Sequence, residues 1–274
     1  MEKANHPNKV SFLFTSEYGL VTDPVMRIGG EKCTYQIPTY EAIKGILHSI
    51  YWKPTIVWYV DRIRVMNPIQ TEVKGIRAIK YVPEMKKGQR IYNDLSYYTY
   101  LKNCAYQVEA HFEWNSNRPE LAADRNENKH HNIAKRMIEK GGRRDVYLGA
   151  RECQGYVEPC VFGEGKGAYD DLPQLSFGLM FHGMTYADEA YDEATRNMMT
   201  ANFWWPIMER GIITSWRQSD PVLDQGWHSG PYAQYHEYGQ CPLCKCPCSL
   251  CNGLCPGHEQ YRPFACTDIH QLRR

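Results

Sequence analysis

The chain has 274 residues, of which 43% are hydrophobic and 23% are charged. These proportions are typical of a globular protein, and the length suffices for one large domain or two modest ones. No stretch approaches the ~18 apolar residues that a membrane-spanning helix needs, and the sequence does not begin with a signal peptide. We therefore expect a cytoplasmic protein with no membrane partner.

The formal net charge of +1 conceals a strong asymmetry. Residues 1–151 contain 24 lysines and arginines against 16 acidic residues, whereas residues 152–274 contain 8 against 15. A basic first half indicates contact with a polyanion. The 20 tyrosines point the same way, because aromatic rings among basic residues stack on unpaired bases, although tyrosine is also an ordinary strand residue.

The first predicted elements are a strand at residues 10–14 and a helix that Thr39 can cap. Pro54 ends this helix, because proline cannot continue the helical hydrogen bonding. The helix has an apolar face, and Tyr51 lies beside that face rather than within it. The apolar face consists of Ile43, Ile46, Leu47 and Ile50.

Residues 55–68 and 97–114 predict two further strands, because they are rich in β-branched and aromatic residues. The charged residues within 55–68 argue against full burial of that strand. Residues 83–96 contain proline, glycine, asparagine and aspartate and predict a loop. A short strand is expected at 145–150.

Residues 124–132 place a lysine beside two histidines where a polar loop runs into a helix. The helix is indicated by apolar residues at helical spacing after residue 132, and two glycines close it. We expect Lys129 and His130 to lie exposed in its first turn. Lysine can stabilise developing negative charge and histidine can transfer a proton near neutral pH. A solvated basic helix start explains the same residues without any chemistry.

The predicted order is strand, helix, strand, strand, helix, strand, which is the split β-α-β arrangement of the ferredoxin-like fold. We predict an α+β protein: a ferredoxin-like (RRM-like) domain at residues 1–157, a small antiparallel β appendage at 158–225 and an irregular Cys-rich tail at 226–274. RNA-binding modules use the open face of such sheets, but the fold also hosts many unrelated functions.

Several segments together resemble the Cas-five proteins of type I-C (Dvulg subtype) CRISPR systems, which belong to the RAMP superfamily. The first reads Ile-Pro-Thr-Tyr-Glu-Ala-Ile-Lys-Gly-Ile and continues to Ser-Ile-Tyr-Trp-Lys-Pro. The segments that match, in order, are 37–46, 49–54, 61–69, 118–119, 124–130, 141–145 and 148–157. Such an ordered series is far more specific than one motif.

The resemblance implies a pre-crRNA endoribonuclease that cleaves CRISPR repeat RNA without a metal or other cofactor. It also implies that the enzyme keeps the 5′ handle of the product within the type I-C Cascade, beside the backbone and large subunits and the target DNA. The family's catalytic tyrosine, lysine and histidine match Tyr51, Lys129 and His130.

The chemistry implied by the resemblance is attack of a ribose 2′-hydroxyl on the adjacent phosphate, which leaves a 2′,3′-cyclic phosphate. It requires a base, a cation for the developing charge and an acid for the leaving oxygen. Lys129 suits the charge, while Tyr51 and His130 can divide the proton transfers in either order. Tyrosine, with a pKa near ~10, is a poor base unless a neighbour such as Lys129 lowers that pKa.

Five basic residues are candidates for gripping RNA phosphates or bases. They are Lys53, Arg125, Arg143, Arg144 and Arg151. Surface solvation or internal salt bridges explain them equally well. A non-catalytic scaffold that holds the crRNA handle is the alternative function, although the intact catalytic residues favour an enzyme.

The tail concentrates cysteines in a way that the resemblance does not explain. Cys241 and Cys244, like Cys248 and Cys251, have the two-residue spacing that suits a structural zinc site. The pairs lie closer together than in zinc ribbons, and the spacing up to Cys255 only approaches that of an iron–sulfur motif. A tail that binds no metal is the other interpretation, and a DNA- or metal-responsive binding protein is a third functional class.

Overall fold

Three strands form the centre of the main sheet. The computed structural model describes residues 8–24, 26, 31–186 and 199–214. β1 (Val10–Gly19) pairs antiparallel with β5 (Gln89–Trp114), which pairs antiparallel with β3 (Ile56–Val65). The register places Phe12 opposite Val108 and Val60 opposite Ala110. Within the described ranges the sheet has ten strands in the order β6-β7-β1-β5-β3-β12-β11-β8, with β2 and β4 paired to β5.

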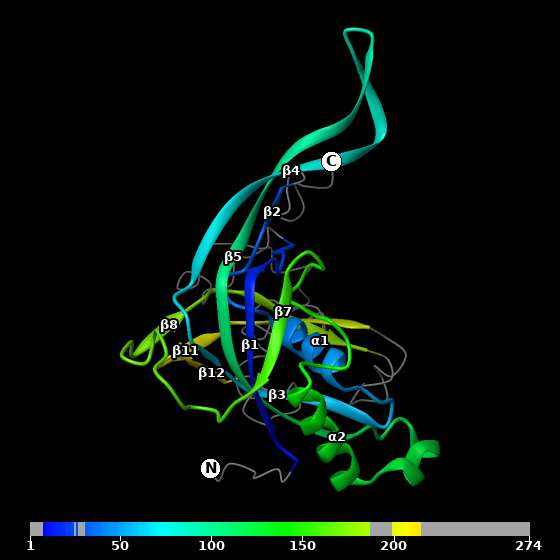
Figure 1. Ribbon diagram of the computed structural model, residues 1–274, viewed down its shortest axis with the longest axis vertical. Helices are drawn as coiled ribbons and strands as arrows, with labels where there is room; N and C mark the ends of the chain where they lie inside the picture. Colours follow the sequence, from blue (N-terminus) through cyan, green and yellow to red (C-terminus); the bar gives the residue numbers. More distant parts are fainter. Residues whose placement is uncertain (1–7, 25, 27–30, 187–198, 215–274) are drawn as a thin grey trace, which may run out of the picture. The chain divides into compact units, whose positions relative to one another are not determined.

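The remaining elements flank this centre (Figure 1). The helices are α1 (Tyr40–Ile50), the 3-10 helix η2 (Pro119–Asp124) and α2 (Glu127–Glu139). The other strands are β2 (Lys32–Cys33), β4 (Gln70–Lys86), β6 (Val146–Tyr147), β7 (Gln154–Pro159), β8 (Gln174–Ser176), β9 (Met180–Thr185), β10 (Thr200–Trp204), β11 (Ile207–Glu209) and β12 (Ile212–Thr214). The α+β class expected from the sequence is thus what the structure has.

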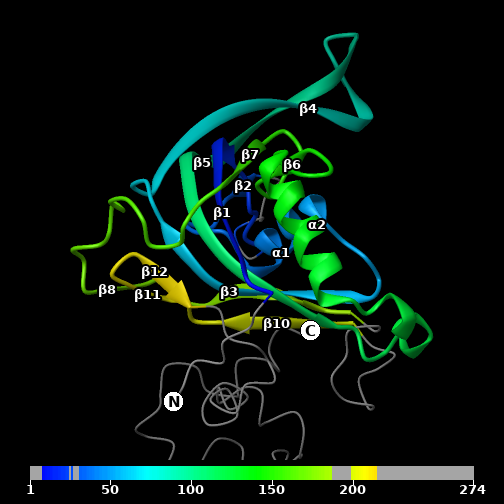
Figure 2. The same cartoon turned by 60° about the horizontal axis from the view of Figure 1, so that its bottom comes forward.

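Both long helices lie on one face of the sheet (Figure 2). Side chains alternate between the faces of a strand, so every second residue of β1 and β5 points toward the helices. Those residues form the core with the apolar face of α1, and each large apolar side chain buried there stabilises the fold by about 1.5–3 kcal/mol. The most buried include Phe12, Phe14, Trp58, Val108, Phe112, Ile43 and Leu47.

The predicted loop at residues 83–96 is wrong, because these residues continue β4 and β5 as one long hairpin (Figure 1). Lys87 and Gly88 form its turn with φ angles of 51° and 78°, and positive φ at both central positions is typical of the type I′ hairpin turn. Apolar residues such as Ile79 and Leu95 are exposed here. No side chain that the structure describes between residues 76 and 96 is buried, so the sequence lacks the alternation that normally indicates a strand.

The strand at 55–68 is confirmed as β3, but the expectation that its charges oppose burial is wrong at Arg64. The Arg64 side chain is 6% exposed and forms a 2.7 Å ion pair with Asp170. Its guanidinium also donates to Gln107 and to the carbonyls of Glu164 and Gly165. Burial is tolerated because the guanidinium is fully hydrogen bonded.

Residues 1–215 form one compact unit. The segment expected as a β appendage contributes β8, β11 and β12, which extend the main sheet because β12 pairs with β3. β9 and β10 pair with each other in a separate two-stranded sheet. The expected boundary at residue 157 falls within β7. The Cys-rich tail lies outside the described residues. No helix in the described part of the chain is long and apolar enough to cross a membrane.

Candidate active site

The start of α2 places Lys129 and His130 side by side. Asn126 caps the helix, because its side-chain oxygen accepts the Lys129 N–H at 3.0 Å. The Lys129 side chain is 49% exposed, as expected, but the expectation that His130 is exposed is wrong, since its side chain is fully buried. The rings of Phe112 and Trp114 on β5 pack edge-on against the imidazole. Sequence spacing cannot reveal this cover because β5 supplies it from a distant part of the chain.

Tyr51 reaches the same histidine from the end of α1. Its backbone N–H donates to the carbonyl of Leu47, and its own carbonyl accepts the indole N–H of Trp58 at 2.7 Å. These bonds hold the buried ring so that its hydroxyl lies 2.7 Å from Nδ1 of His130. Two residues separated by 79 positions therefore share one hydrogen bond.

The second nitrogen of His130 fixes the direction of that bond. Nε2 lies 2.8 Å from the backbone carbonyl oxygen of Asp124. A carbonyl only accepts hydrogen bonds, so Nε2 must carry a proton, and Nδ1 of the neutral ring is then an acceptor. The Tyr51 hydroxyl consequently donates to His130.

Asp124 connects the lysine with the histidine. Its carboxylate accepts hydrogen bonds from the Lys129 ammonium and, at 2.8 Å, from the hydroxyl of Thr55. The second carboxylate oxygen lies 3.5 Å from Nε2 of His130. The hydrogen bond from Lys129, and then that from Thr55, lowers the pKa of Asp124, so the carboxylate is ionised at neutral pH.

Sequence reasoning assigned no role to Thr55 or Asp124. Asp124 begins the stretch of residues 124–132 that drew attention to Lys129 and His130, so its position was a usable signal. Thr55 follows the proline that ends the first helix, and nothing in the sequence distinguishes it from a threonine that opens a strand.

The Tyr51 hydroxyl is not a strong base on its own. Burial, and then the negative charge of Asp124, raises its pKa, while the positive charge of Arg143 lowers it. Loss of its proton therefore depends on an acceptor such as Nδ1 of His130.

The structure places three of the five RNA-binding candidates beside this cluster. Arg143 and Arg144 are exposed, and their backbone N–H groups donate to the carbonyls of Ile50 and Ser49 at the end of α1. Lys53 is exposed two residues beyond Tyr51. The three side chains thus border the end of α1 from two separate loops.

Arg125 and Arg151 differ from these three. Arg125 donates to the carbonyls of Asn115 and Arg118, which is an internal contact. Arg151 follows Leu148, whose carbonyl accepts the N–H of Leu20 just beyond the end of β1. Because α2 contacts Lys9 at the opposite end of β1, Arg151 is separated from the catalytic cluster by roughly the length of that strand, about 30 Å.

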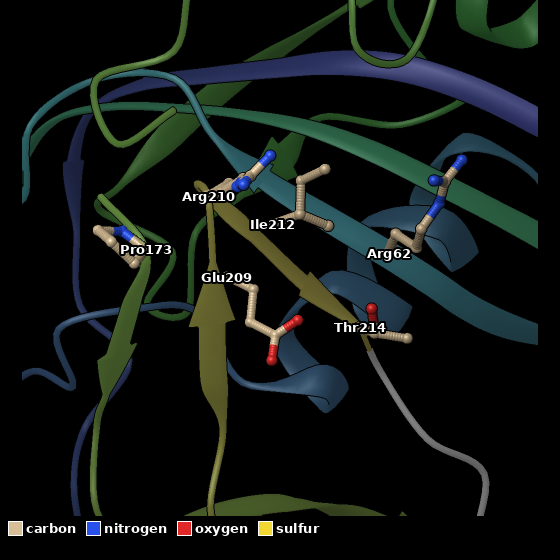
Figure 3. A pocket seen from close by; sticks show the side chains of 6 residues that line it. All are labelled: Arg62, Pro173, Glu209, Arg210, Ile212 and Thr214. Atoms are coloured by element: carbon tan, nitrogen blue, oxygen red, sulfur yellow. The ribbon is translucent and has the colours of Figure 1, made fainter. Parts of the chain in front are cut away.

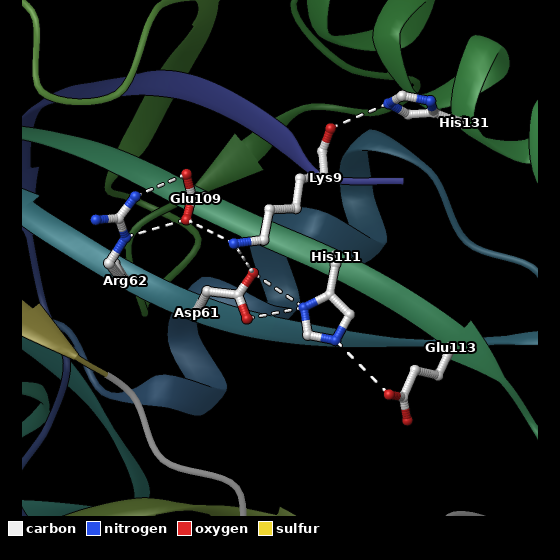
Figure 4. A network of polar contacts seen from close by, with 7 residues as sticks. All are labelled: Lys9, Asp61, Arg62, Glu109, His111, Glu113 and His131. Atoms are coloured by element: carbon white, nitrogen blue, oxygen red, sulfur yellow. Dashed lines mark hydrogen bonds and ion pairs between the residues drawn. The ribbon is translucent and has the colours of Figure 1, made fainter. Parts of the chain in front are cut away.

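A second polar cluster lies on the other face of the sheet (Figure 4). His111 is buried there, with Nδ1 2.8 Å from Asp61 and Nε2 3.8 Å from Glu113. Arg62 forms two hydrogen bonds with Glu109, which also accepts one from Lys9. Glu109, His111 and Glu113 alternate along β5 with Phe112 and Trp114, which pack against His130. The second cluster and the catalytic cluster therefore occupy opposite faces of the sheet.

A cavity of about 330 Å³ opens beside this second cluster, near the turn between β11 and β12 (Figure 3). Its lining residues are Arg62, Pro173, Glu209, Arg210, Ile212 and Thr214. None of the predicted site residues lines it.

Neither cluster resembles a metal centre. Among the residues that the structure describes, no group of three or more His, Cys, Asp or Glu is arranged to hold a metal ion. The predicted zinc ligands Cys241, Cys244, Cys248 and Cys251 lie outside those residues.

The chain is similar to several known proteins. Residues 10–215 match the Cas5d model of the family described as CRISPR-associated protein (Cas_Cas5). The CRISPR pre-crRNA endoribonuclease Cas5d of Mannheimia succiniciproducens is 30% identical over 169 residues, which cover 56% of this chain and 68% of the relative. The protein of the same name from Thermus thermophilus is 29% identical and covers 60% and 70%. A solved structure titled as a CRISPR-associated protein is 32% identical, covers 77% of this chain and 93% of its own, and has a TM-score of 0.62.

Proposed function

Since the chain belongs to the Cas5d family of CRISPR-associated proteins, we propose that Tyr51, Lys129 and His130 form the active site with which it cleaves its RNA. As a member of this family it is a CRISPR pre-crRNA endoribonuclease. The observation that carries the assignment is the 2.7 Å bond between the Tyr51 hydroxyl and His130 Nδ1, with the Lys129 ammonium connected to the same histidine through the Asp124 carboxylate. This arrangement supplies a proton path and a cation at one place.

In the proposed step, the 2′-oxygen of a ribose attacks the adjacent phosphorus and the bond to the 5′-oxygen breaks. The 2′-hydroxyl gives its proton to the Tyr51 oxygen while the Tyr51 proton passes to Nδ1 of His130. The proton on Nε2 of His130 then goes to the leaving 5′-oxygen once that nitrogen turns from the Asp124 carbonyl. The products are a 2′,3′-cyclic phosphate and a free 5′-hydroxyl, and the imidazole ends as the other tautomer.

The proposed role of Lys129 is to stabilise the negative charge that develops on the phosphate oxygens. It is the exposed member of the cluster, so the phosphodiester approaches from its side. The chemistry uses only side chains of this chain, and we propose that it needs no metal ion. The loop that carries Arg143 and Arg144, together with Lys53, supplies further positive charge for neighbouring phosphates.

The strand order supports a ferredoxin-like arrangement for the catalytic unit. Its four strands in chain order are β1, β3, β5 and β7, and in space they follow β7-β1-β5-β3. The fourth strand thus lies beside the first, with the third and second beyond it. We propose that residues 158–225 act as the β appendage of this unit and that Cys241, Cys244, Cys248 and Cys251 are the ligands of a structural zinc in the tail.

We further propose that the protein stays on the 5′ handle of its product in the cytoplasm, as a subunit of the type I-C Cascade. The basic first half of the chain supports retention of an RNA. The partners would be the backbone and large subunits, with the target DNA reaching the assembled complex.

The test is cleavage of the cognate repeat hairpin in EDTA by wild type, Lys129→Ala and His130→Ala. The wild type should cut and leave a cyclic phosphate, and each variant should lose about 100-fold or more in rate, which is typical for loss of a positioned proton-transfer or charge-stabilising group. Tight binding by the wild type without a cut would contradict the active site and favour a scaffold that holds the handle. Cleavage that requires a divalent cation would contradict metal independence alone.

A further inference from the structure

The Asp124 carboxylate lies where three donors of the active site converge. The Lys129 ammonium donates to one of its oxygens and the Thr55 hydroxyl to the other, with His130 Nε2 3.5 Å away. A phosphate with two unbridged oxygens presents the same kind of acceptor pair to the same donors. The carboxylate therefore resembles the substrate group in both charge and hydrogen bonding.

While the Asp124 carboxylate contacts Lys129, the charge at this place does not favour catalysis. Asp124 neutralises the positive charge of Lys129, and the transition state of phosphate cleavage adds negative charge at the same place. A carboxylate that remained there would repel the phosphate and occupy the ammonium that must stabilise it. The Asp124 backbone carbonyl also accepts a hydrogen bond from Nε2 of His130, the nitrogen that faces away from Tyr51.

Thr55 and Asp124 differ in how firmly the fold holds them. Thr55 is 2% exposed, and its carbonyl accepts the N–H of Asn115 at the start of β3. Asp124 ends η2, in which no residue is buried, and its side chain is 32% exposed. Asp124 can therefore move away without disturbing the core, whereas the Thr55 hydroxyl stays in place.

From these contacts we propose that Thr55 is a phosphate-binding residue of the active site, and that the Asp124 carboxylate occupies the phosphate position until RNA displaces it. This inference rests on the proposed function, because it names the group that the scissile phosphate meets. It makes Asp124 an internal competitor of the substrate and Thr55 a fixed hydrogen-bond donor to it.

The test measures affinity for a repeat RNA that carries a 2′-deoxyribose at the cleavage site and so cannot react. Asp124→Asn removes the competing charge but keeps an oxygen that accepts from Thr55, so it should bind this RNA about tenfold more tightly. Thr55→Val should bind about tenfold more weakly, because a hydrogen bond to a charged group is lost, and Thr55→Ser should restore the affinity.

A matched control lies on the same turn. Glu120 of η2 is 59% exposed and pairs only weakly with Arg118, at 3.7 Å. Glu120→Gln removes one negative charge from η2 without touching the cluster, so it should change the affinity by less than about twofold. An equal gain in Glu120→Gln and Asp124→Asn would show a general charge effect and overturn the proposal.

Two other results would also overturn it. Unchanged or weaker binding by Asp124→Asn, with cleavage lost as in Lys129→Ala, would make Asp124 a fixed positioning residue. Equal losses in Thr55→Ser and Thr55→Val, both with wild-type thermal unfolding, would show that the hydroxyl does not bind the phosphate. RNA cleavage by wild type and Glu120→Gln is measured with the same preparations. If both cleave while one of these contrary binding results is found, this inference fails and the proposed function stands. If neither cleaves, the proposed function itself fails.

Discussion

Two buried histidines on opposite faces of β5 show how the same side chain is used in two ways. His130 lies on α2, on the helix-covered side of the sheet, with a tyrosine hydroxyl on one nitrogen and a backbone carbonyl on the other. His111 faces away from them, with Asp61 on one side and Glu113 on the other (Figure 4). Both are almost fully buried, so burial alone does not distinguish a reactive histidine from a structural one.

The difference lies in what the partners can do with a proton. The Tyr51 hydroxyl can give its proton to His130, and the exposed turn that ends at Asp124 covers the second nitrogen. His111 lies between the carboxylates of Asp61 and Glu113, in a network of charged residues that also includes Lys9, Arg62 and Glu109. The first arrangement permits proton transfer, whereas the second joins β3, β5 and the residues before β1.

Among the substitutions that test this comparison, we expect the largest effect on the cleavage rate at Tyr51. Tyr51→Phe removes only the hydroxyl that donates to His130, so single-turnover cleavage should fall by about 10²–10³-fold. The free energy of unfolding should fall by only about 1–2 kcal/mol, because one buried acceptor on His130 loses its partner. Urea unfolding at the assay temperature checks that the variant is folded. A variant that cleaves at the wild-type rate would contradict the role of the pair.

The opposite outcome is expected in the second cluster. Asp61→Asn replaces the carboxylate that contacts buried His111 with a neutral amide, and weakening a hydrogen bond to a charged group should lower the free energy of unfolding by about 1–3 kcal/mol. The cleavage rate per folded molecule should stay at the wild-type value. Glu113→Gln is the milder control, since Glu113 lies farther from the ring and is more exposed. Loss of cleavage in fully folded Asp61→Asn would mean that the two faces are coupled.

A third histidine, His48, extends the comparison because its surroundings disfavour the protonated form of its ring. Burial of His48 on α1, and then the positive charge of Lys44, lowers its pKa from 6.5 to about 4. Between these values the unfolded chain binds a proton that the folded protein does not, so stability is present above pH 6.5 and is lost as the pH falls toward 4.

The measurement for His48 is the free energy of unfolding in urea near pH 7.5 and near pH 4.5. The drop on acidification should be smaller in His48→Gln than in wild type by about 2 kcal/mol. His131, which is only partly buried and bonds to the carbonyl of Lys9, gives the control substitution His131→Gln. An identical pH dependence in wild type and His48→Gln would show that His48 does not titrate as its environment implies.

The smallest effect is expected at Arg143. Its positive charge lowers the Tyr51 pKa, so Arg143→Gln should raise that pKa and slow cleavage by about threefold at neutral pH. Arg143→Lys keeps the charge and should retain most of the rate. The slower rate should persist at saturating RNA, which distinguishes an effect on Tyr51 from weaker binding. Full recovery at high RNA concentration would indicate a binding role only.

The sequence indicated the core elements because their patterns follow burial. The helix at Tyr40–Ile50, the strand at Ile56–Val65 and residues 97–114 of β5 have apolar residues where the structure buries them. The outer half of the β4–β5 hairpin could not be found this way, because neither face of it is covered. Arg64 was misjudged because its partner Asp170 is 106 positions away.

The candidate site was predictable in its members but not in its connections. Lys129 and His130 stood out from the residues at the start of a helix, the resemblance added Tyr51, and the structure brings the three together. The burial of His130 under Phe112 and Trp114, and the contacts of Asp124 with Lys129 and Thr55, depend on how separate elements pack. Such contacts leave no periodic signal in the sequence.

The most direct test of the Tyr51–His130 proton path is a double-mutant cycle on single-turnover cleavage in EDTA, with Tyr51→Phe, His130→Asn and the combined variant. If the two side chains act as one relay, the combined variant should cleave no more slowly than the slower single variant, because either change already interrupts the path. Rate losses that multiply in the combined variant would show independent roles. Such a result would contradict the relay.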